Sequence, residues 1–279
     1  MSPGRLLLGV VLLGAFALTA QALFGAPPPI GAAVAMLLAL LGTLLLGALV
    51  PGLEMYGPML CRGSGRERLV ALTFDDGPSP ASTPLVLDVL RERGARATFF
   101  VIGRRALEQP ELIARMVREG HVVGLHGMDH HRGYAFLSPR AVEQDIRDCA
   151  RAVMTAGAPQ PLWFRPPIGQ ASSRTFAGAR RAGVELVAWS FRGRDGLRST
   201  DGDPFLGRLD RALVPGAIVL LHDAWERPQA ADEVPPLGAR LLPQILELCT
   251  KKGLEPVTLD ELVQAGESGR STTKRAPAA

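Results

Sequence analysis

Two adjacent carboxylates, Asp75 and Asp76, follow an apolar run and precede a Gly-Pro pair. The run, residues 69–74, carries β-branched and aromatic side chains, which predicts a short buried strand ending in a turn. In an α/β fold such strand ends are where sites are usually built. Adjacent side chains on an extended chain point to opposite sides, so the two carboxylates need not share one role. The pair alone also suits a solvated turn, because Asp-Gly-Pro is ordinary turn chemistry.

Four of the five histidines lie within the eleven residues from 121 to 131. Neutral imidazole is a common ligand for zinc and similar metals. His126 and His130 are four residues apart at the end of a predicted strand, and a helical turn would let both reach one ion. A carboxylate from another strand end would complete the ligand set, with Asp75 and Asp76 as the available donors. A chance cluster of surface histidines is the alternative.

Three further segments place polar side chains after predicted strands. Arg165 is followed by two prolines, a rigid turn that can hold the guanidinium against a carboxylate and aim the N–H of Ile168 into a site. A plain Pro-rich loop with a solvated arginine is the alternative there. Asp195 follows the fifth predicted strand, and His222 follows the sixth. Because parallel strands end on one rim, where barrel enzymes keep their sites, the five segments together predict one site.

The elements that must position these residues alternate between strand and helix. Seven segments have the composition of strands: 69–74, 97–102, 121–125, 162–164, 184–190, 217–221 and 255–258. Helical patterns lie between them at 83–93, 109–119, 138–156, 172–182 and 241–252. Alternation with short links predicts a parallel sheet. About seven strands in roughly 200 residues favour an α/β fold of the distorted (β/α) barrel type, closed or nearly closed, over an open sheet.

The N-terminal segment has a different composition. Between Arg5 and Glu54 no residue is charged, and a run of three prolines separates two apolar stretches at about 6–26 and 30–50. Each stretch has about the length that crosses a bilayer as a helix, and neither has the polar face of a soluble helix. Residues 1–57 therefore predict a membrane anchor, a transmembrane helical hairpin in contact with membrane lipid. A signal peptide cleaved after Ala22, followed by one anchor, is the alternative.

The charge distribution predicts the side of the membrane. The connector between the two stretches is uncharged, whereas their outer flanks carry arginines at positions 5, 62, 66 and 68. The positive-inside bias therefore predicts a multi-pass protein of the cell membrane whose main domain, residues 58–266, faces the cytoplasm. Residues 267–279 are rich in small and polar residues and predict a disordered tail.

The composition limits the kinds of partner that the sequence predicts. The net charge is +4, and no run of Lys and Arg with interleaved aromatics indicates a nucleic-acid partner. Three widely spaced cysteines show no metal-ligand spacing and predict unpaired thiols. Nothing in the sequence identifies a protein partner.

The five segments, in this order between residues 69 and 263, resemble the motifs of the NodB-homology polysaccharide deacetylases, carbohydrate esterase family 4. The resemblance implies that Asp75 is the general base. It implies that the ligands of a divalent metal are Asp76, His126 and His130. The metal is most often Zn²⁺ in this family, with Co²⁺ or Mn²⁺ as alternatives.

The same resemblance assigns the remaining roles. Arg165 would pair with Asp75 and keep it ionised, and Asp195 would orient His222 as the general acid. Leu220 would line the pocket for the acyl methyl group. The implied activity is metal-dependent hydrolysis of a linear amide, which removes an N-acyl group, most often acetyl, from an amino sugar of a polysaccharide or cell-wall glycan. General acid and base groups each contribute on the order of 10²–10⁴ in rate to such reactions.

The sequence departs from the family motifs at several positions. Gly127 stands where Ser or Thr is usual, and Ile168 stands where an aromatic is usual, so only a backbone role remains for it. In the fourth motif Arg192 replaces an Asp and Gly196 replaces a Trp. These changes predict a more open acyl pocket with added positive charge at its mouth, where Arg192 becomes a candidate substrate-binding residue.

Two alternatives to the glycan deacetylase remain open. Residues 123–131 are similar to the branch of the family that deformylates aminoarabinose on a lipid phosphate carrier, and Arg192 and Arg194 could meet a phosphate. The first alternative is therefore a deacetylase or deformylase of a lipid-linked amino sugar on the cytoplasmic face. The second is an inactive, membrane-tethered glycan-binding module.

Overall fold

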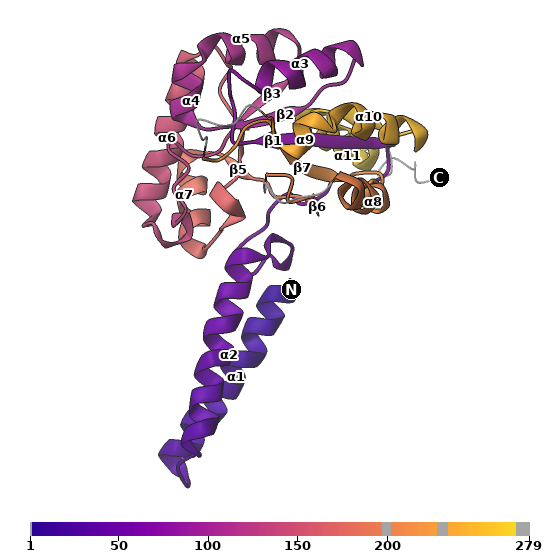
Figure 1. Cartoon of the computed structure of the whole chain (residues 1–279). Coiled ribbons are helices and arrows are strands. Elements are labelled where there is room, and N and C mark those ends of the chain that lie inside the picture. Colours follow the sequence, from indigo (N-terminus) through magenta and orange to yellow (C-terminus); the bar gives the residue numbers. More distant parts are fainter. Residues whose placement is uncertain (1, 197–201, 228–233, 272–279) are drawn as a thin grey trace, which may run out of the picture.

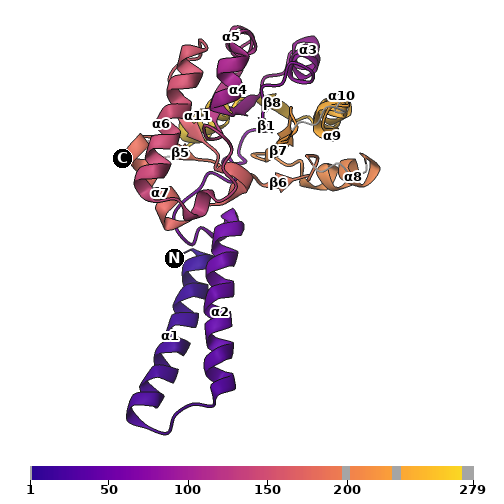
Figure 2. The same cartoon turned by 60° about the vertical axis from the view of Figure 1, so that its left-hand side comes forward.

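The structure, a computed structural model, describes residues 2–196, 202–227 and 234–271. It consists of an N-terminal helical hairpin that projects from an α/β domain (Figure 1). Viewed after a 60° rotation, the helices of the domain surround a central set of strands (Figure 2).

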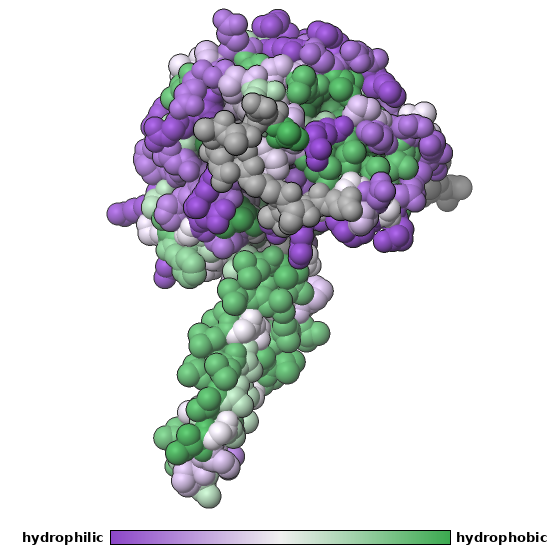
Figure 3. All heavy atoms as spheres, in the orientation of Figure 1, coloured by the Kyte–Doolittle hydropathy of each residue, from purple (hydrophilic) through white to green (hydrophobic). Residues whose placement is uncertain are grey.

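The hairpin consists of helices α1 (Pro3–Phe24) and α2 (Ile30–Leu49), which run antiparallel. Both are long and apolar enough to cross a membrane, and a signal sequence would pass the same test. Apolar side chains cover the hairpin surface in the space-filling view (Figure 3). The observed helices lie close to the two predicted stretches. The N-terminus and the α/β domain lie at the same end of the hairpin, opposite the Pro-rich connector (Figure 1).

One parallel sheet forms the centre of the domain. Its strands are β1 (Leu69–Asp75), β2 (Thr98–Val101), β3 (Val122–Leu125), β4 (Trp163–Phe164), β5 (Glu185–Leu186), β6 (Phe191–Arg192), β7 (Ile218–His222) and β8 (Glu255–Val257). Seven of them follow the order β5-β4-β3-β2-β1-β7-β6, and β8 pairs with the beginning of β1. The predicted distorted barrel of about seven parallel strands is therefore confirmed.

The barrel is bridged on one side by the segment that leaves the hairpin. Leu60 exchanges backbone hydrogen bonds with Leu186 and Ala188, and the N–H of Gly63 donates to Gly216. The predicted single strand at 184–190 is wrong in extent, because two short strands, β5 and β6, flank an extended connection there. That connection crosses between the two ends of the sheet: Val187 donates to Phe164 of β4, Ala188 donates to Leu60 of the bridging segment, and Ser190 donates to Ile218 of β7.

Helices cover the outside of the sheet. They are α3 (Thr83–Glu92), α4 (Gly103–Glu108), α5 (Pro110–Arg118), α6 (Pro139–Thr155), α7 (Ser173–Ala182), α8 (Gly202–Ala212), α9 (Leu237–Arg240), α10 (Leu242–Lys251) and α11 (Leu259–Ser271). Five of these correspond to predicted helices, whereas α4, α8, α9 and α11 were not predicted. Helix α11 continues past residue 267, where the predicted tail begins, and residues 272–279 lie outside the described part of the chain.

The two faces of strand β1 pack into different parts of the domain. On β1, Val70, Leu72 and Phe74 pack into the large cluster beneath the helices. The alternate residues Ala71, Thr73 and Asp75 belong to the opposite, inner face, where Ala71 joins a second cluster with Phe100 and Ile218. The inner face is therefore apolar at the start of the strands and polar at their carboxyl ends, which is where the predicted site residues lie.

Candidate active site

Asp75 is held by a fully buried arginine. Nη1 of Arg165 donates to Oδ1 of Asp75 at 2.6 Å and to the hydroxyl of Thr73 at 2.8 Å, while Nη2 donates to the carbonyl oxygen of Ala188 at 2.8 Å. The guanidinium carbon lies 4.1 Å from the ring centroid of Phe100, in cation–π geometry. A buried guanidinium requires a partner, so the ion pair fixes the position of the Asp75 side chain at the end of β1.

Asp76 turns toward the same side as Asp75 because of its backbone. Successive residues of a strand would point to opposite faces, but Asp76 has φ of 74°, in the left-handed region. Its Oδ1 lies 3.5 Å from Nε2 of His126 and 3.4 Å from Nε2 of His130. This buried oxygen has no hydrogen-bond donor among the described residues. The strained conformation thus directs a carboxylate oxygen at two imidazoles.

The three side chains form a group suited to a metal ion. Their ligand atoms all lie within 4.8 Å of one another, and no other such group occurs in the described part of the chain. Nδ1 of His126 lies 2.7 Å from the carbonyl oxygen of Arg165, to which it can only donate, so Nε2 carries the lone pair that faces Asp76. One carboxylate and two imidazoles are a common donor set for zinc and related divalent metals, so the residues fit such an ion.

The loop between the two histidines is not helical, contrary to the sequence expectation. Gly127 has φ of 82° and His130 has φ of 52°, and these left-handed residues bring the two rings to a centroid distance of 5.0 Å. The carboxylate of Asp145, on α6, accepts from the backbone N–H of Met128 at 3.2 Å. A helix outside the barrel therefore stabilises the loop that carries His130.

His222 ends β7 and is oriented by Asp195. Nδ1 of His222 lies 3.0 Å from Oδ1 of Asp195, and the backbone N–H of His222 donates to Oδ2 of the same carboxylate at 2.8 Å. Because Asp75 on β1 is in register with His222 on β7, the two side chains leave adjacent strands at the same level. Nε2 of His222 lies 3.9 Å from Oδ2 of Asp76, which directs it toward the metal-ligand group.

Buried charges set the protonation of these groups. Burial alone would lower the pKa of His222, but the carboxylates of Asp195, Asp76 and Asp75 outweigh it and raise that pKa to about 10. For Asp76, burial acts to raise the pKa, and the three imidazoles around it lower that pKa well below its usual range. Burial, with the charge of His126 next, lowers the pKa of His130 to about 4. The site thus contains an ionised carboxylate, a neutral imidazole and a protonated imidazole.

The pKa of His126 is shifted in the opposite direction to that of His130. Burial acts to lower its pKa, yet Asp75 and Asp76 together raise it. A proton and a metal ion compete for the same Nε2, so a divalent ion between Asp76 and His126 would replace this proton. Metal affinity should therefore fall as the pH falls.

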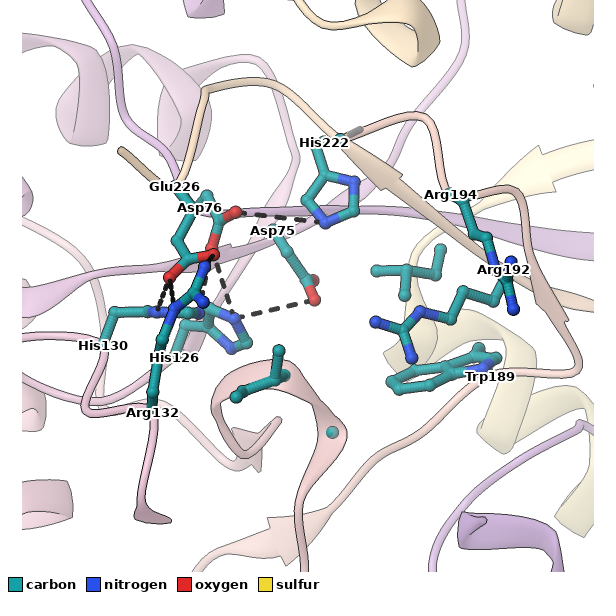
Figure 4. A pocket seen from close by; sticks show the side chains of 14 residues that line it. Asp75, Asp76, His126, His130, Arg132, Trp189, Arg192, Arg194, His222 and Glu226 are labelled. Carbon is teal, nitrogen blue, oxygen red and sulfur yellow. Dashed lines mark hydrogen bonds and ion pairs between the residues drawn. The ribbon is translucent and has the colours of Figure 1, made fainter. Parts of the chain in front are cut away.

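The predicted residues converge on one cavity of about 400 Å³ (Figure 4). The three predicted metal ligands line it, together with Asp75, His222, Ile168, Leu220 and Arg192. The buried partners Arg165 and Asp195 lie behind this lining and contact it through hydrogen bonds. Leu220 pairs with Arg192 across β7 and β6, which brings an apolar wall and a positive charge to the same side of the cavity.

Three further lining residues were not predicted. Glu226 accepts from Arg132 through both oxygens at 2.5 Å, and its Oε1 lies 3.4 Å from Nδ1 of His130. Trp189 packs so closely on Gly169 that a Cβ there would meet its ring at 2.2 Å. Arg192 lies 5.3 Å from the centroid of the Trp189 ring. No spacing signal in the sequence points to Glu226 or Arg132, because both come from loops.

Backbone strain is concentrated at this cavity. Five non-glycine residues of the described chain have positive φ, and four of them line the cavity: Asp76, His130, Ile168 and Arg194. Such conformations cost on the order of 1–3 kcal/mol each and persist where the surroundings impose them. Their clustering at one cavity indicates a site whose side-chain directions are under functional constraint.

Comparisons with known proteins agree with this geometry. The family profile described as polysaccharide deacetylase matches residues 62–187. A peptidoglycan-N-acetylglucosamine deacetylase of Bacillus cereus is 35% identical over 215 residues, which cover 76% of this chain and 96% of that protein. A chitooligosaccharide deacetylase of a Bradyrhizobium species is 44% identical over 160 residues, which cover 57% of this chain and 72% of that protein.

Solved structures share the fold. A family 4 acetyl xylan esterase from Clostridium thermocellum, in complex with a cobalt ion, superposes with a TM-score of 0.61 at 32% identity. The superposition covers 70% of this chain and 89% of that one. The fold and the relatives define a class of hydrolases that remove acyl groups from carbohydrates. The chain belongs to the polysaccharide deacetylase family, carbohydrate esterase family 4, which confirms the resemblance seen in its motifs.

Proposed function

We propose that this protein is a metal-dependent deacetylase that removes the N-acetyl group from N-acetylglucosamine units of a glycan. The observation that carries the proposal is the convergence, in one cavity, of the Asp75–Arg165 pair, the metal-ligand group and the His222–Asp195 pair. Each part supplies one requirement of amide hydrolysis, and the relatives named for peptidoglycan and chitooligosaccharide deacetylation support the substrate class.

Asp76, His126 and His130 would hold a divalent ion, and Zn²⁺ or Co²⁺ suits this donor set best. When bound, such an ion lowers the pKa of a coordinated water from 15.7 to about 7 and polarises a carbonyl oxygen. The cobalt complex of the Clostridium thermocellum relative supports an ion in this family.

Asp75 and His222 would each carry out one of the two proton transfers in the reaction. Asp75 accepts the proton of the attacking water, because Arg165 occupies its Oδ1 and leaves Oδ2 directed at the cavity. His222 donates a proton to the departing amine, since its carboxylate partners favour the protonated ring. The environments of Asp75 and His222 thus separate base from acid.

The cavity walls would bind the sugar and its acyl group. Leu220 is nearly buried and contributes an apolar wall for the acetyl methyl. Trp189 packs against Gly169 and contributes an aromatic ring to the cavity lining, to which Gly196, in place of the family's fourth-motif Trp, also belongs. A backbone N–H from Ile168, in a turn with φ of 54°, would stabilise the developing oxyanion.

The test is a substrate panel. The full chain, loaded with Zn²⁺ or Co²⁺, is assayed for acetate release on N-acetylglucosamine oligomers, peptidoglycan, acetylated xylan and a polyprenyl-phosphate-linked N-acyl amino sugar. The proposal predicts release from the first two. Turnover of acetylated xylan alone would overturn it in favour of ester hydrolysis. Stoichiometric metal without turnover of any substrate would favour the inactive binding module.

A lipid-linked amino sugar is the second candidate, and one observation favours it. Arg192 and Arg194 both reach the cavity, so a substrate with a phosphate beside the amino sugar would meet positive charge (Figure 4). Turnover of the polyprenyl-phosphate sugar in preference to the oligomers would support this candidate, and turnover of the oligomers alone would exclude it.

We also propose that α1 and α2 anchor the protein in the cell membrane, with residues 58–266 as the deacetylase domain. The length and apolar composition of both helices support the anchor. The arginines that flank the hairpin favour a cytoplasmic domain, which is the location that the lipid-linked candidate requires, whereas action on the polymerised cell wall requires the opposite side. A reporter fused after Ala279 tests the side: cytoplasmic signal supports the lipid-linked candidate, and signal from the opposite side removes it.

A further inference from the structure

A second cavity lies where the hairpin meets the α/β domain. Its volume is about 600 Å³, and its polar lining comes from three segments: Arg5 on α1, Tyr56 in the linker, and Ser173, Arg180 and Glu185 on or after α7. It shares no lining residue with the catalytic cavity. The deacetylase mechanism uses none of these side chains.

Specific contacts fix the geometry of this junction. The hydroxyl of Ser2 donates to the carbonyl oxygen of Glu54 at 2.9 Å, and the N–H of Ala171 donates to the carbonyl oxygen of Ala48, on α2, at 3.2 Å. Gly57 packs on Phe176 so closely that a Cβ would meet the ring at 2.5 Å. The end of α2 thus contacts the loop that precedes α7, and the linker packs on α7 itself, so the cavity has walls from the hairpin, the linker and the domain.

The cavity lies at the depth of lipid headgroups if the hairpin spans the bilayer, and to that extent the inference rests on the proposed membrane anchor. Helix α1 has 22 residues and is about 33 Å long, close to the thickness of the hydrocarbon core of about 30 Å. Arg5 is in the first turn of α1, at the domain end, so its guanidinium reaches the membrane–water boundary. Arg180 approaches the same cavity from the domain.

The guanidinium groups of Arg5 and Arg180 are available to bind a ligand. Within the described residues, no hydrogen bond or ion pair engages the side chain of Arg5 or that of Arg180, and both residues are exposed. Arginine forks bind phosphate oxygens in bidentate geometry. Glu185 is the only acidic residue in the lining, so the cavity has a net positive charge.

We propose that this cavity binds the phosphodiester headgroup of an anionic phospholipid, with Arg5 and Arg180 on the phosphate oxygens. The bound lipid holds the domain at a fixed orientation on the membrane surface. Glu185 opposes the negative charge of the lipid and limits its affinity.

The test uses the full chain in a neutral detergent, titrated with phosphatidylglycerol, phosphatidylcholine or inorganic phosphate, with bound lipid measured by native mass spectrometry. We expect phosphatidylglycerol to bind at least about tenfold more tightly than phosphatidylcholine, and inorganic phosphate to bind weakly because it lacks the apolar part of the lipid. Equal retention of the two lipids, or tight binding of inorganic phosphate alone, would overturn a lipid site.

Variants separate this site from general charge effects. Arg180→Gln and Arg5→Gln should each weaken phosphatidylglycerol binding by about tenfold, whereas Arg181→Gln, next on the same helix but outside the cavity lining, should leave it unchanged. Glu185→Gln should tighten binding, and a loss there would overturn the anionic ligand in favour of one that carries an amine. Circular dichroism confirms folding of each variant.

The outcome is independent of catalysis. Acetate release should be unchanged in these variants, because none of the altered residues lines the catalytic cavity. Failure of the deacetylase proposal would appear as absent turnover in the unaltered protein, whereas failure of this inference would appear as equal lipid binding by all the variants.

Discussion

Asp75 and Asp76 are neighbours in the chain, but the structure predicts opposite consequences when each is altered. Oδ1 of Asp75 accepts from Arg165 at 2.6 Å, and its Oδ2 lies 3.8 Å from Nε2 of His126. Asp75→Asn keeps an oxygen for Arg165 but cannot accept the proton of an attacking water. Loss of a general base costs about 10²–10⁴ in kcat, which corresponds to about 3–5 kcal/mol in the activation barrier.

Asp76→Ala should act on the metal itself. The carboxylate of Asp76 lies 3.4–3.5 Å from both ligand imidazoles, so its loss removes one of three protein ligands. Altering an outer partner of a ligand already costs about 10–100-fold in metal affinity, and we expect loss of the ligand to cost at least about 100-fold by the same reasoning. Asp75→Asn should leave metal affinity within about tenfold.

The assay combines three measurements on each variant. Competition with a chromophoric chelator gives metal affinity, acetate release gives kcat at saturating metal, and urea denaturation gives the free energy of unfolding. Asp210→Asn alters a half-buried carboxylate on α8 that pairs with Lys252 at the surface; it serves as the control and should change none of them. If Asp75→Asn and Asp76→Ala bound metal equally well, the division of roles between the two carboxylates would be wrong.

Three further predictions follow from buried groups. Arg165→Met leaves the carboxylate of Asp75 buried without its partner and should lower the free energy of unfolding by about 3–5 kcal/mol; an unchanged urea midpoint would refute the importance of the pair. His222→Asn should slow amide hydrolysis by about 10²–10⁴ but ester hydrolysis of 4-nitrophenyl acetate by only about tenfold or less, because nitrophenolate leaves without a proton; equal losses would argue against an acid role. Burial lowers the pKa of His121 from 6.5 to about 4, so the unfolded chain binds a proton that the folded chain excludes. Stability present above pH 6.5 should therefore fall by up to about 3 kcal/mol as the pH drops from 6.5 to 4, and His121→Gln should flatten that part of the urea-derived curve; an unaltered slope would contradict this origin.

Much of the fold was predictable because local signals agreed with tertiary structure. The apolar run before Asp75 became β1, and Ser138-Pro139 opened α6 as an N-cap followed by proline. The run at 184–190 was misread as one strand, because composition cannot show where a chain changes sheet partners. Helices α4 and α9 are short, with six and four residues, and too few turns to give a periodic pattern.

The sequence predicted which residues would lie together at the strand ends, but not the geometry in which they meet. The motifs identified the residues at the strand ends, yet the register that sets Asp75 beside His222 depends on the whole sheet. The left-handed backbone of Asp76 and His130 has no sequence signal, because neither residue is a glycine. Glu226 and Trp189 reach the cavity from loops, so only the assembled structure reveals them.

The most direct test of the central claim is acetate release from N-acetylglucosamine oligomers by the full chain, first stripped of metal with a chelator and then titrated with Zn²⁺ or Co²⁺. Because one ligand group is present in the described chain, release should be absent from the stripped protein and saturate at one ion per chain. Each acetate should be matched by one free amine, and Asp75→Asn should bind the ion without turnover. Release that persists after the metal is removed, or full occupancy of the site without any acetate, would contradict the account.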